Sequence, residues 1–338
     1  MGKHLMAKYL VTGFVSRQAN PQKNSRDVMV SWLLAAALRD MGHEVEHRNP
    51  TMNEDYSEFD QIFLGLAALH SVGCNRSYGW LAAYLKAYDK VTLYIDDVDT
   101  AKVLSGIRVI ANDPYKLTKE FYKYRLEYEQ ASQPQWHDWL MQGVFMLRDN
   151  AWPRVIVPMF PWGDVSKYQS QLPNATELVP LDLSSYVPQY VGPDEWSPEP
   201  ERQWVTEMED SNRWFQQQRA IYPFKRFGKG FEKRPSDEGL VLEYAKNWGV
   251  IEQGLDNGFF HSRLVYAAQA QTLFITRWQN IQQLGDAYAL LPVAAAGLSP
   301  DDRIVWAQAQ RTALDAWTHD RDTVKDQLSE LLKVKADV

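Results

Sequence analysis

Four short segments of this chain combine residue types that could do chemistry on a sugar, a phosphate or a nucleic acid. The first is YIDDVD at residues 94–99, where acids follow a run of β-branched and aromatic residues. Asp97 is therefore expected just beyond the end of a strand. A carboxylate buried there beside other acids would have a raised pKa and could act as a general base. The alternatives are a solvated acidic loop, a helix cap, or a D-x-D metal site formed by Asp97 and Asp99.

The second segment is a loop of small residues, LAALHSVGCNR, at residues 66–76. The small side chains near Ser71, Gly73 and Asn75 would let a ligand approach the backbone amides closely. A plain turn from strand to helix, capped by Asn75 or Ser77, explains the same residues equally well.

The third segment is SNRWFQQQR at residues 211–219. Arg213 and Arg219 could converge on a pyrophosphate from a loop and from the first turn of a helix, where the helix dipole also favours anions. Surface salt bridges are the competing interpretation.

The fourth segment is KRFGKGFEKR at residues 225–234, in which Phe227 and Phe231 separate basic residues. Flexible glycines, cationic side chains and stacking aromatics are what a nucleic-acid contact loop needs. The alternative is a solvated basic loop, although the cluster contrasts with the net charge of -7 of the whole chain. Its basic residues are Lys225, Arg226, Lys229, Lys233 and Arg234.

Short β-type runs and helical patterns alternate in the first half of the chain and must position these segments. Helical periodicity between the runs predicts a βαβ pattern, and therefore a parallel, doubly wound sheet with right-handed crossovers. Ligands bind such sheets beyond the carboxyl ends of the strands. The expected strands are Lys8–Thr12, Glu44–His47, Gln61–Leu66, Val91–Ile95, Ile107–Ala111 and Arg154–Val157.

A segment with four prolines and one glycine, residues 187–201, is the expected linker to a second, smaller α/β domain. We expect an N-terminal domain over 1–186 and a C-terminal domain over 202–298. The latter would contain strands near Trp204–Met208 and Thr272–Thr276 and a helix from about Glu238. One long helix within 299–338 is expected to pack back across the domain junction, with Arg321 interrupting its apolar face.

Composition excludes several classes of protein. The single cysteine, Cys74, rules out an internal disulfide and a zinc site built on several thiolates. The apolar runs fall short of the roughly 18 to 20 residues of a membrane span, and the first ten residues lack the apolar stretch of a signal peptide. We expect a monomer without membrane attachment in the cytoplasm, which is the host's cytoplasm if a phage encodes the protein.

In their order along the chain, these segments resemble those of the phage DNA glycosyltransferases, which have the two-domain GT-B fold. VTLYIDD places Asp97 on the family's catalytic aspartate, and SNRWFQQQR places Arg213 and Arg219 on its arginine pair. GFFHSRLVYAAQAQTLFI, at residues 258–275, resembles the donor-binding helix and the strand after it, with Arg263 on the phosphate-contacting arginine. The resemblance implies two Rossmann-like domains that face a cleft.

One residue departs from the family pattern. The family's ribose-binding glutamate is Tyr266 in this chain, and a tyrosine hydroxyl lacks the two strong acceptors of a carboxylate. The donor's identity therefore stays open, with a UDP-sugar as the default. The expected donor-binding residues are Arg213, Arg219, Arg263, Tyr266 and Gly13. The expected DNA-binding residues are Ser71, Gly73, Asn75 and Arg76, together with the five basic residues of 225–234.

The implied activity is transfer of a sugar from a nucleotide-sugar to the hydroxyl of a 5-hydroxymethyl pyrimidine in duplex DNA. No tightly bound cofactor is expected, and a divalent metal is compatible with the reaction without being required. Two other classes stay open. One is a GT-B enzyme with a small-molecule, protein or lipid acceptor, and the other is a non-catalytic protein that binds DNA or a sugar nucleotide.

Overall fold

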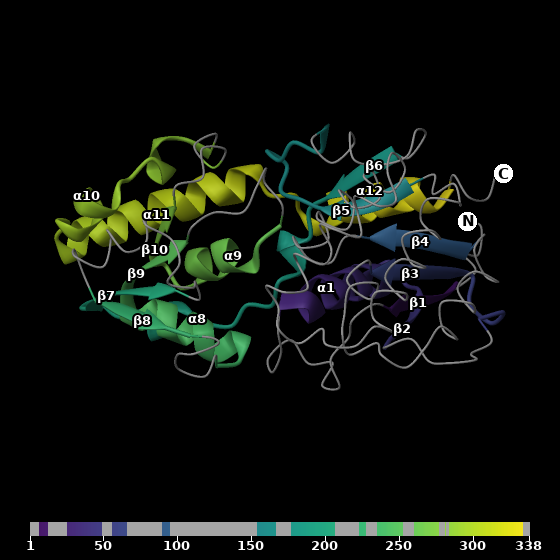
Figure 1. Cartoon of the computed structure of the whole chain (residues 1–338), viewed down its shortest axis with the longest axis horizontal. Coiled ribbons are helices and arrows are strands. Elements are labelled where there is room, and N and C mark those ends of the chain that lie inside the picture. Colours follow the sequence, from purple (N-terminus) through teal and green to yellow (C-terminus); the bar gives the residue numbers. More distant parts are fainter. Residues whose placement is uncertain are drawn as a thin grey trace, which may run out of the picture.

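The structure is a computed structural model that describes eleven stretches of the chain. These are residues 7–12, 26–48, 56–65, 90–94, 154–166, 177–206, 223–227, 235–252, 260–276, 281 and 284–333, with backbone only for 26–29 and 193. The described elements form two parallel sheets, one from each half of the chain, with helices packed against them (Figure 1).

The first sheet has six parallel strands in the order β2-β1-β3-β4-β5-β6. Every residue of β3 and β4 is buried, as expected for strands covered on both faces. The helix α1, Arg26–Asp40, packs against β1 and β2. The strands are β1 (Lys8–Thr12), β2 (Glu44–His47), β3 (Gln61–Gly65), β4 (Val91–Tyr94), β5 (Arg154–Pro158) and β6 (Glu177–Leu181).

The second sheet has four parallel strands in the order β10-β9-β7-β8. Gly249, in the central strand β9, has no room for a side chain, because a Cβ there would lie 2.6 Å from the ring of Trp204. The strands are β7 (Glu201–Thr206), β8 (Phe224–Arg226), β9 (Asn247–Glu252) and β10 (Leu273–Thr276). Two helices, α8 (Asp237–Lys246) and α9 (Ser262–Gln269), connect them.

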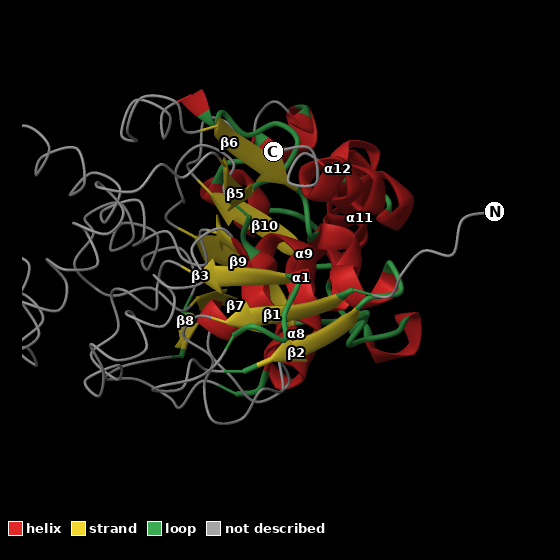
Figure 2. Ribbon diagram, turned by 90° about the vertical axis from the view of Figure 1, so that its right-hand side faces the viewer, coloured by secondary structure: helices red, strands yellow, loops and turns green. Residues whose placement is uncertain are grey.

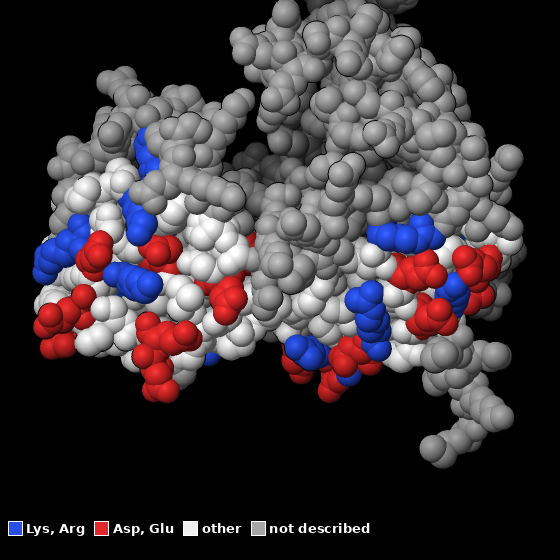
Figure 3. All heavy atoms as spheres, turned by 90° about the horizontal axis from the view of Figure 1, so that it is seen from below, with Lys and Arg blue, Asp and Glu red and all other residues white. Residues whose placement is uncertain are grey.

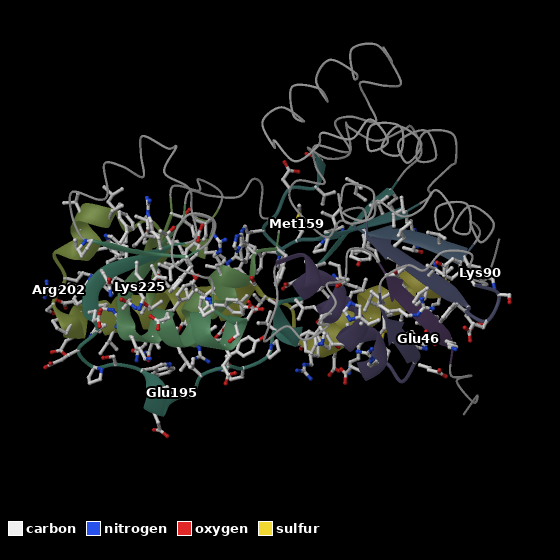
Figure 4. All side chains as sticks on the ribbon, turned by 60° about the horizontal axis from the view of Figure 1, so that its bottom comes forward. Glu46, Lys90, Met159, Glu195, Arg202 and Lys225 are labelled. Carbon is white, nitrogen blue, oxygen red and sulfur yellow. The ribbon has the colours of Figure 1, made fainter. Side chains whose placement is uncertain are left out.

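The strands of both sheets run towards the middle of the molecule. Lys90 at the start of β4 and Arg202 near the start of β7 lie at opposite ends of the molecule, whereas Met159, directly after β5, lies near the middle (Figure 4). The carboxyl ends of the strands, where α/β sheets bind ligands, therefore approach the junction between the two sheets.

The C-terminal segment differs from the single helix that the sequence predicted. Its described residues contain two helices, α11 (Pro300–Trp317) and α12 (Arg321–Lys333), and the short helix α10 (Pro292–Ala296) precedes the segment. The chain breaks between α11 and α12 because Thr318 is extended and the Asp320 carboxylate accepts a hydrogen bond from Thr323 N at 2.8 Å. Arg321 thus starts a new helix. Helix α11 packs on α9 and β10, whereas α12 packs on α1, and both lie on one side of the sheets (Figure 2).

Three contacts fasten the start of α12 to the first half of the chain. The buried carboxylate of Asp182, just after β6, accepts a hydrogen bond from the backbone N–H of His319 at 2.8 Å. Arg321 donates to the Ser185 carbonyl at 3.2 Å, and its guanidinium lies 5.0 Å from the ring centre of Tyr186. Ser184–Tyr186 forms the short 3-10 helix η5.

The segment between the sheets lies along α9. Gln269, the last residue of α9, donates to the Pro188 carbonyl at 2.8 Å and accepts from Tyr190 N at 3.3 Å. Trp196 donates from Nε1 to the Gln269 carbonyl at 3.0 Å. One hydrophobic core runs through residues of both sheets, including Ile156 and Val250, so the junction is packed. The remaining short 3-10 helices are η6 (Pro193–Glu195) and η9 (Asp286–Tyr288).

Candidate active site

The two halves of the molecule meet at the carboxyl end of β5. The backbone N–H of Phe260 donates a hydrogen bond to the Pro158 carbonyl at 2.9 Å. The Phe260 ring lies 5.4 Å from that of Phe160, which stacks on Trp162 at 4.4 Å. These contacts place the segment before α9 directly against the first sheet.

Arg263 lies in the first turn of α9, three residues after this contact. Its backbone N–H donates to Nδ1 of His261 at 3.1 Å, so His261 caps the helix and its ring nitrogen acts as the acceptor. The guanidinium Nη1 donates to the Glu252 carboxylate, at the end of β9, at 2.5 Å. A guanidinium at a helix N-terminus, beyond the carboxyl edge of a parallel sheet, is suited to binding an anion such as a diphosphate.

Tyr266 lies one turn further along α9 and is fully buried. Its ring packs edge to face against Tyr190, with the ring centres 5.7 Å apart. The ring is thus part of the core between α9 and residues 187–201. A donor contact through Tyr266 stays a prediction.

The first two residues of the predicted basic loop belong to strand β8. Lys225 pairs with the Glu243 carboxylate at 2.5 Å, and Arg226 is buried, with its guanidinium 5.9 Å from the ring centre of Phe224. The prediction of a loop is therefore wrong for these two residues, because both belong to strand β8. Lys229, Lys233 and Arg234 lie outside the described residues.

Most of the other predicted site residues also lie outside the described residues. They are Gly13, Ser71, Gly73, Asn75, Arg76, Asp97, Arg213 and Arg219. The strands that lead to two of them are described: β1 ends at Thr12, directly before Gly13, and β4 ends at Tyr94, three residues before Asp97. Tyr94 donates from its hydroxyl to the Thr12 carbonyl at 3.5 Å, so its side chain links the ends of β1 and β4, which lie on either side of β3 in the sheet.

The sequence interpretation missed Glu252 and His261. Glu252 ends β9, which was not predicted because NWGVIE begins with a polar residue and contains a glycine. A signal for His261 was present, since a polar residue directly before the apolar pattern of α9 is typical of a helix cap.

The described residues contain no group of three or more His, Cys, Asp or Glu side chains arranged to hold a metal ion. The D-x-D pair of Asp97 and Asp99 falls outside them. Among the described helices, none combines the length and apolar character needed to cross a bilayer.

No protein-family model matches the chain, and no curated protein matches it in sequence. Solved structures match almost all of it. Sucrose-phosphate synthase from Thermosynechococcus elongatus is 11% identical with a TM-score of 0.53, and the match covers 96% of this chain and 98% of that chain. Anabaena HepE, solved with UDP and glucose, is 12% identical with a TM-score of 0.52, covering 97% and 100%.

The T4 phage β-glucosyltransferase, solved with its UDP-glucose substrate, is 11% identical with a TM-score of 0.51, covering 98% of this chain and 100% of that chain. These likenesses, together with the two parallel sheets, show that the chain has the GT-B fold. The predicted fold class is confirmed.

Proposed function

We propose that this protein is a glycosyltransferase that moves a sugar from a nucleotide-sugar donor, by default a UDP-sugar, to the hydroxyl of a 5-hydroxymethyl pyrimidine in duplex DNA. The observation that carries the donor half of this proposal is the position of Arg263. It stands in the first turn of α9, beyond the carboxyl edge of the second sheet, at the junction with the first sheet of a GT-B fold.

The proposed reaction forms a bond between the acceptor oxygen and the anomeric carbon of the sugar. The bond from that carbon to the diphosphate oxygen breaks, and the nucleoside diphosphate leaves. Asp97 takes the proton of the acceptor hydroxyl, while Arg213, Arg219 and Arg263 offset the charge on the departing diphosphate. A base within a duplex presents its hydroxymethyl group poorly, so we expect it to flip out of the stack at a cost of a few kcal/mol.

The choice of a UDP-sugar is supported by the ligands of similar structures. The T4 phage enzyme was solved with UDP-glucose and HepE with UDP and glucose. Both structures contain glucose, so the proposed donor is a UDP-sugar with glucose as the first sugar to test.

The choice of DNA as the acceptor is supported by the sequence resemblance to phage DNA glycosyltransferases and by the basic segment 225–234. On the face seen in Figure 3, acidic and basic side chains of the described residues are interspersed. That face offers no broad field of positive charge among its described residues. Because the whole chain also carries a net charge of -7, we expect contact with a polyanion to need a local basic segment.

A GT-B enzyme with a small-molecule acceptor is the second candidate, and one observation favours it. Lys225 is paired with Glu243 and Arg226 is buried, so two of the five basic residues of the segment are engaged within the protein. The two candidate functions share the nucleotide-sugar donor and differ in the acceptor.

Incubation with a panel of sugar nucleotides and hydroxymethylated duplex DNA, followed by mass spectrometry of the nucleosides, tests the proposal. We expect a hexose or pentose added to the modified base, and no addition to unmodified DNA. Hydrolysis of the sugar nucleotide, or transfer of its sugar to a free sugar phosphate, without transfer to DNA would favour the second candidate. The Asp97→Asn variant is the control, because it should form much less product if the parent enzyme catalyses the transfer through Asp97.

A further inference from the structure

Glu252 and Arg263 form an ion pair that is almost completely buried. Glu252 has 5% of its surface exposed and Arg263 has 3%, and the two side chains meet at 2.5 Å. Burying two charges costs several kcal/mol per ion, and apolar residues of similar volume often give equal or greater stability. Because burying these two charges is unfavourable, their presence at the junction of the two sheets indicates a role other than stabilising the fold.

The backbone of Arg263 is fixed from two sides. The ring of His261 accepts its N–H, and the Phe260 amide, three residues earlier, is bonded to Pro158 of the first sheet. The remaining freedom is in the long side chain, whose rotamer entropy is about 2 kcal/mol. Glu252 removes that freedom, because its carboxylate holds Nη1 from the end of the neighbouring strand.

We propose that Glu252 is a positioning residue for Arg263, and that it fixes the guanidinium in advance in the orientation that binds the donor's diphosphate. A guanidinium has five N–H donors in a rigid fork, so a carboxylate at Nη1 is compatible with a phosphate on another edge. Fixing the side chain before binding lowers the entropy lost when the donor binds. This inference rests on the proposed role of Arg263 in donor binding.

A double-mutant cycle read by calorimetry with UDP and with UDP-glucose tests this role. The four proteins are the parent, Glu252→Gln, Arg263→Ala and the double variant. We expect Glu252→Gln to weaken UDP binding about five- to tenfold, because the amide is a poorer partner than the carboxylate for the guanidinium. The double variant should bind UDP like Arg263→Ala alone, since Glu252 acts only through Arg263.

Glu243→Gln is the matched control, because Glu243 lies in the same half of the chain and pairs with Lys225. It should leave UDP affinity unchanged. Thermal unfolding confirms that each variant is folded. If Glu252→Gln does not fold, Glu252→Asp keeps the charge but withdraws it by one methylene, and it should also weaken UDP binding.

Three results would overturn the inference. They are parental or tighter UDP binding by a folded Glu252 variant, additive losses in the double variant, and an equal loss in Glu243→Gln. If Arg263→Ala itself binds UDP like the parent, the proposed donor role of Arg263 fails. If Arg263→Ala weakens UDP binding but Glu252→Gln does not, only the positioning role of Glu252 is overturned.

Discussion

The backbone N–H of Phe260 donates a 2.9 Å hydrogen bond to the carbonyl oxygen of Pro158 and thereby joins the two halves of the molecule. Pro158 is the last residue of β5 in the first sheet, and Phe260 precedes the helix that carries Arg263. The arginine assigned to the donor is therefore anchored to the sheet expected to carry the general base. If Arg263 binds the donor as proposed, we expect donor binding to depend on the position of the first sheet, because only three residues separate this hydrogen bond from Arg263.

The coupling predicts an effect of Phe160, whose ring contacts Phe260. Phe160→Leu keeps an apolar side chain and should cost up to about 1.5 kcal/mol of stability. It removes the ring contact that steadies the start of α9, so we expect the KM for the donor to rise several-fold. Steady-state kinetics with the donor varied provides the measurement.

Phe59→Leu is the control for this effect. Phe59 is as buried as Phe160, at 1% exposure each, but it lies before β3, at the amino end of the first sheet. A comparable rise in donor KM in both variants would mean that weakened packing in general, and not the junction, is responsible.

Asp97 is the predicted general base, three residues beyond the end of β4. Asp97→Asn removes the proton acceptor while keeping the shape of the side chain, so turnover should fall about 10²-fold or more. Donor affinity should stay within about twofold, because the donor contacts are assigned to arginines. Near-normal turnover in a folded Asp97→Asn protein would remove Asp97 from the mechanism.

His47 predicts a pH dependence of stability. Its ring nitrogen Nε2 lies 2.9 Å from the Ser31 hydroxyl, and burial together with the positive charge of Arg39 lowers its pKa from 6.5 to about 4. The folded state therefore binds this proton less tightly than the unfolded state. The stabilising contribution is complete above about pH 6.5 and is lost as the pH falls towards about 4.

We expect the loss to be roughly 2 kcal/mol after allowing for partial exposure of the ring. Denaturant unfolding at pH 4.5 and pH 7.5 measures it, and His47→Gln, which does not titrate, is the control. The difference in stability between the two pH values should be smaller in His47→Gln than in the parent. An equal difference in both proteins would assign the pH dependence to other groups.

The sequence predicted most of the first sheet because its strands are short, β-branched runs between helical patterns. The boundaries of β1 and β2 agree with those expected from the residues alone. Strand β8 was missed because its three residues include two cations, which indicated a loop. The break before α12 had a local signal that the prediction did not use, the helix cap at Asp320. The Asp182 carboxylate that holds His319 is 137 residues distant, and such a contact leaves no local pattern.

The difference between local sequence patterns and contacts of distant residues also applies to the candidate site. Arg263 was proposed from its resemblance to a known motif, whereas Glu252, its ion-pair partner, belongs to a strand that the sequence did not reveal. Residue types in a motif can be predicted from a sequence. The groups that orient them come from elsewhere in the chain and become visible only when the strands are paired.

The last prediction concerns DNA and depends on where the structure places the basic segment. Lys225 and Arg226 are held in β8, so replacing them would disturb packing as well as charge. The informative variant is Lys229→Ala, Lys233→Ala and Arg234→Ala together. Because the whole chain carries a net charge of -7, duplex binding must rely on such local contacts.

We expect the triple variant to bind hydroxymethylated duplex DNA more weakly, with a salt dependence reduced by about 0.9 in log-log slope for each phosphate that the protein no longer neutralises. UDP affinity should be unchanged, because the donor is assigned to other arginines. Lys333→Ala is a control for the loss of a positive charge elsewhere on the surface, since Lys333 is exposed at the end of α12 and pairs with Glu330 three residues before it. Fluorescence anisotropy over a salt series measures the slope. A triple variant that binds and modifies DNA like the parent at every salt concentration would show that the segment is a solvated surface and that the DNA contact lies elsewhere on the protein.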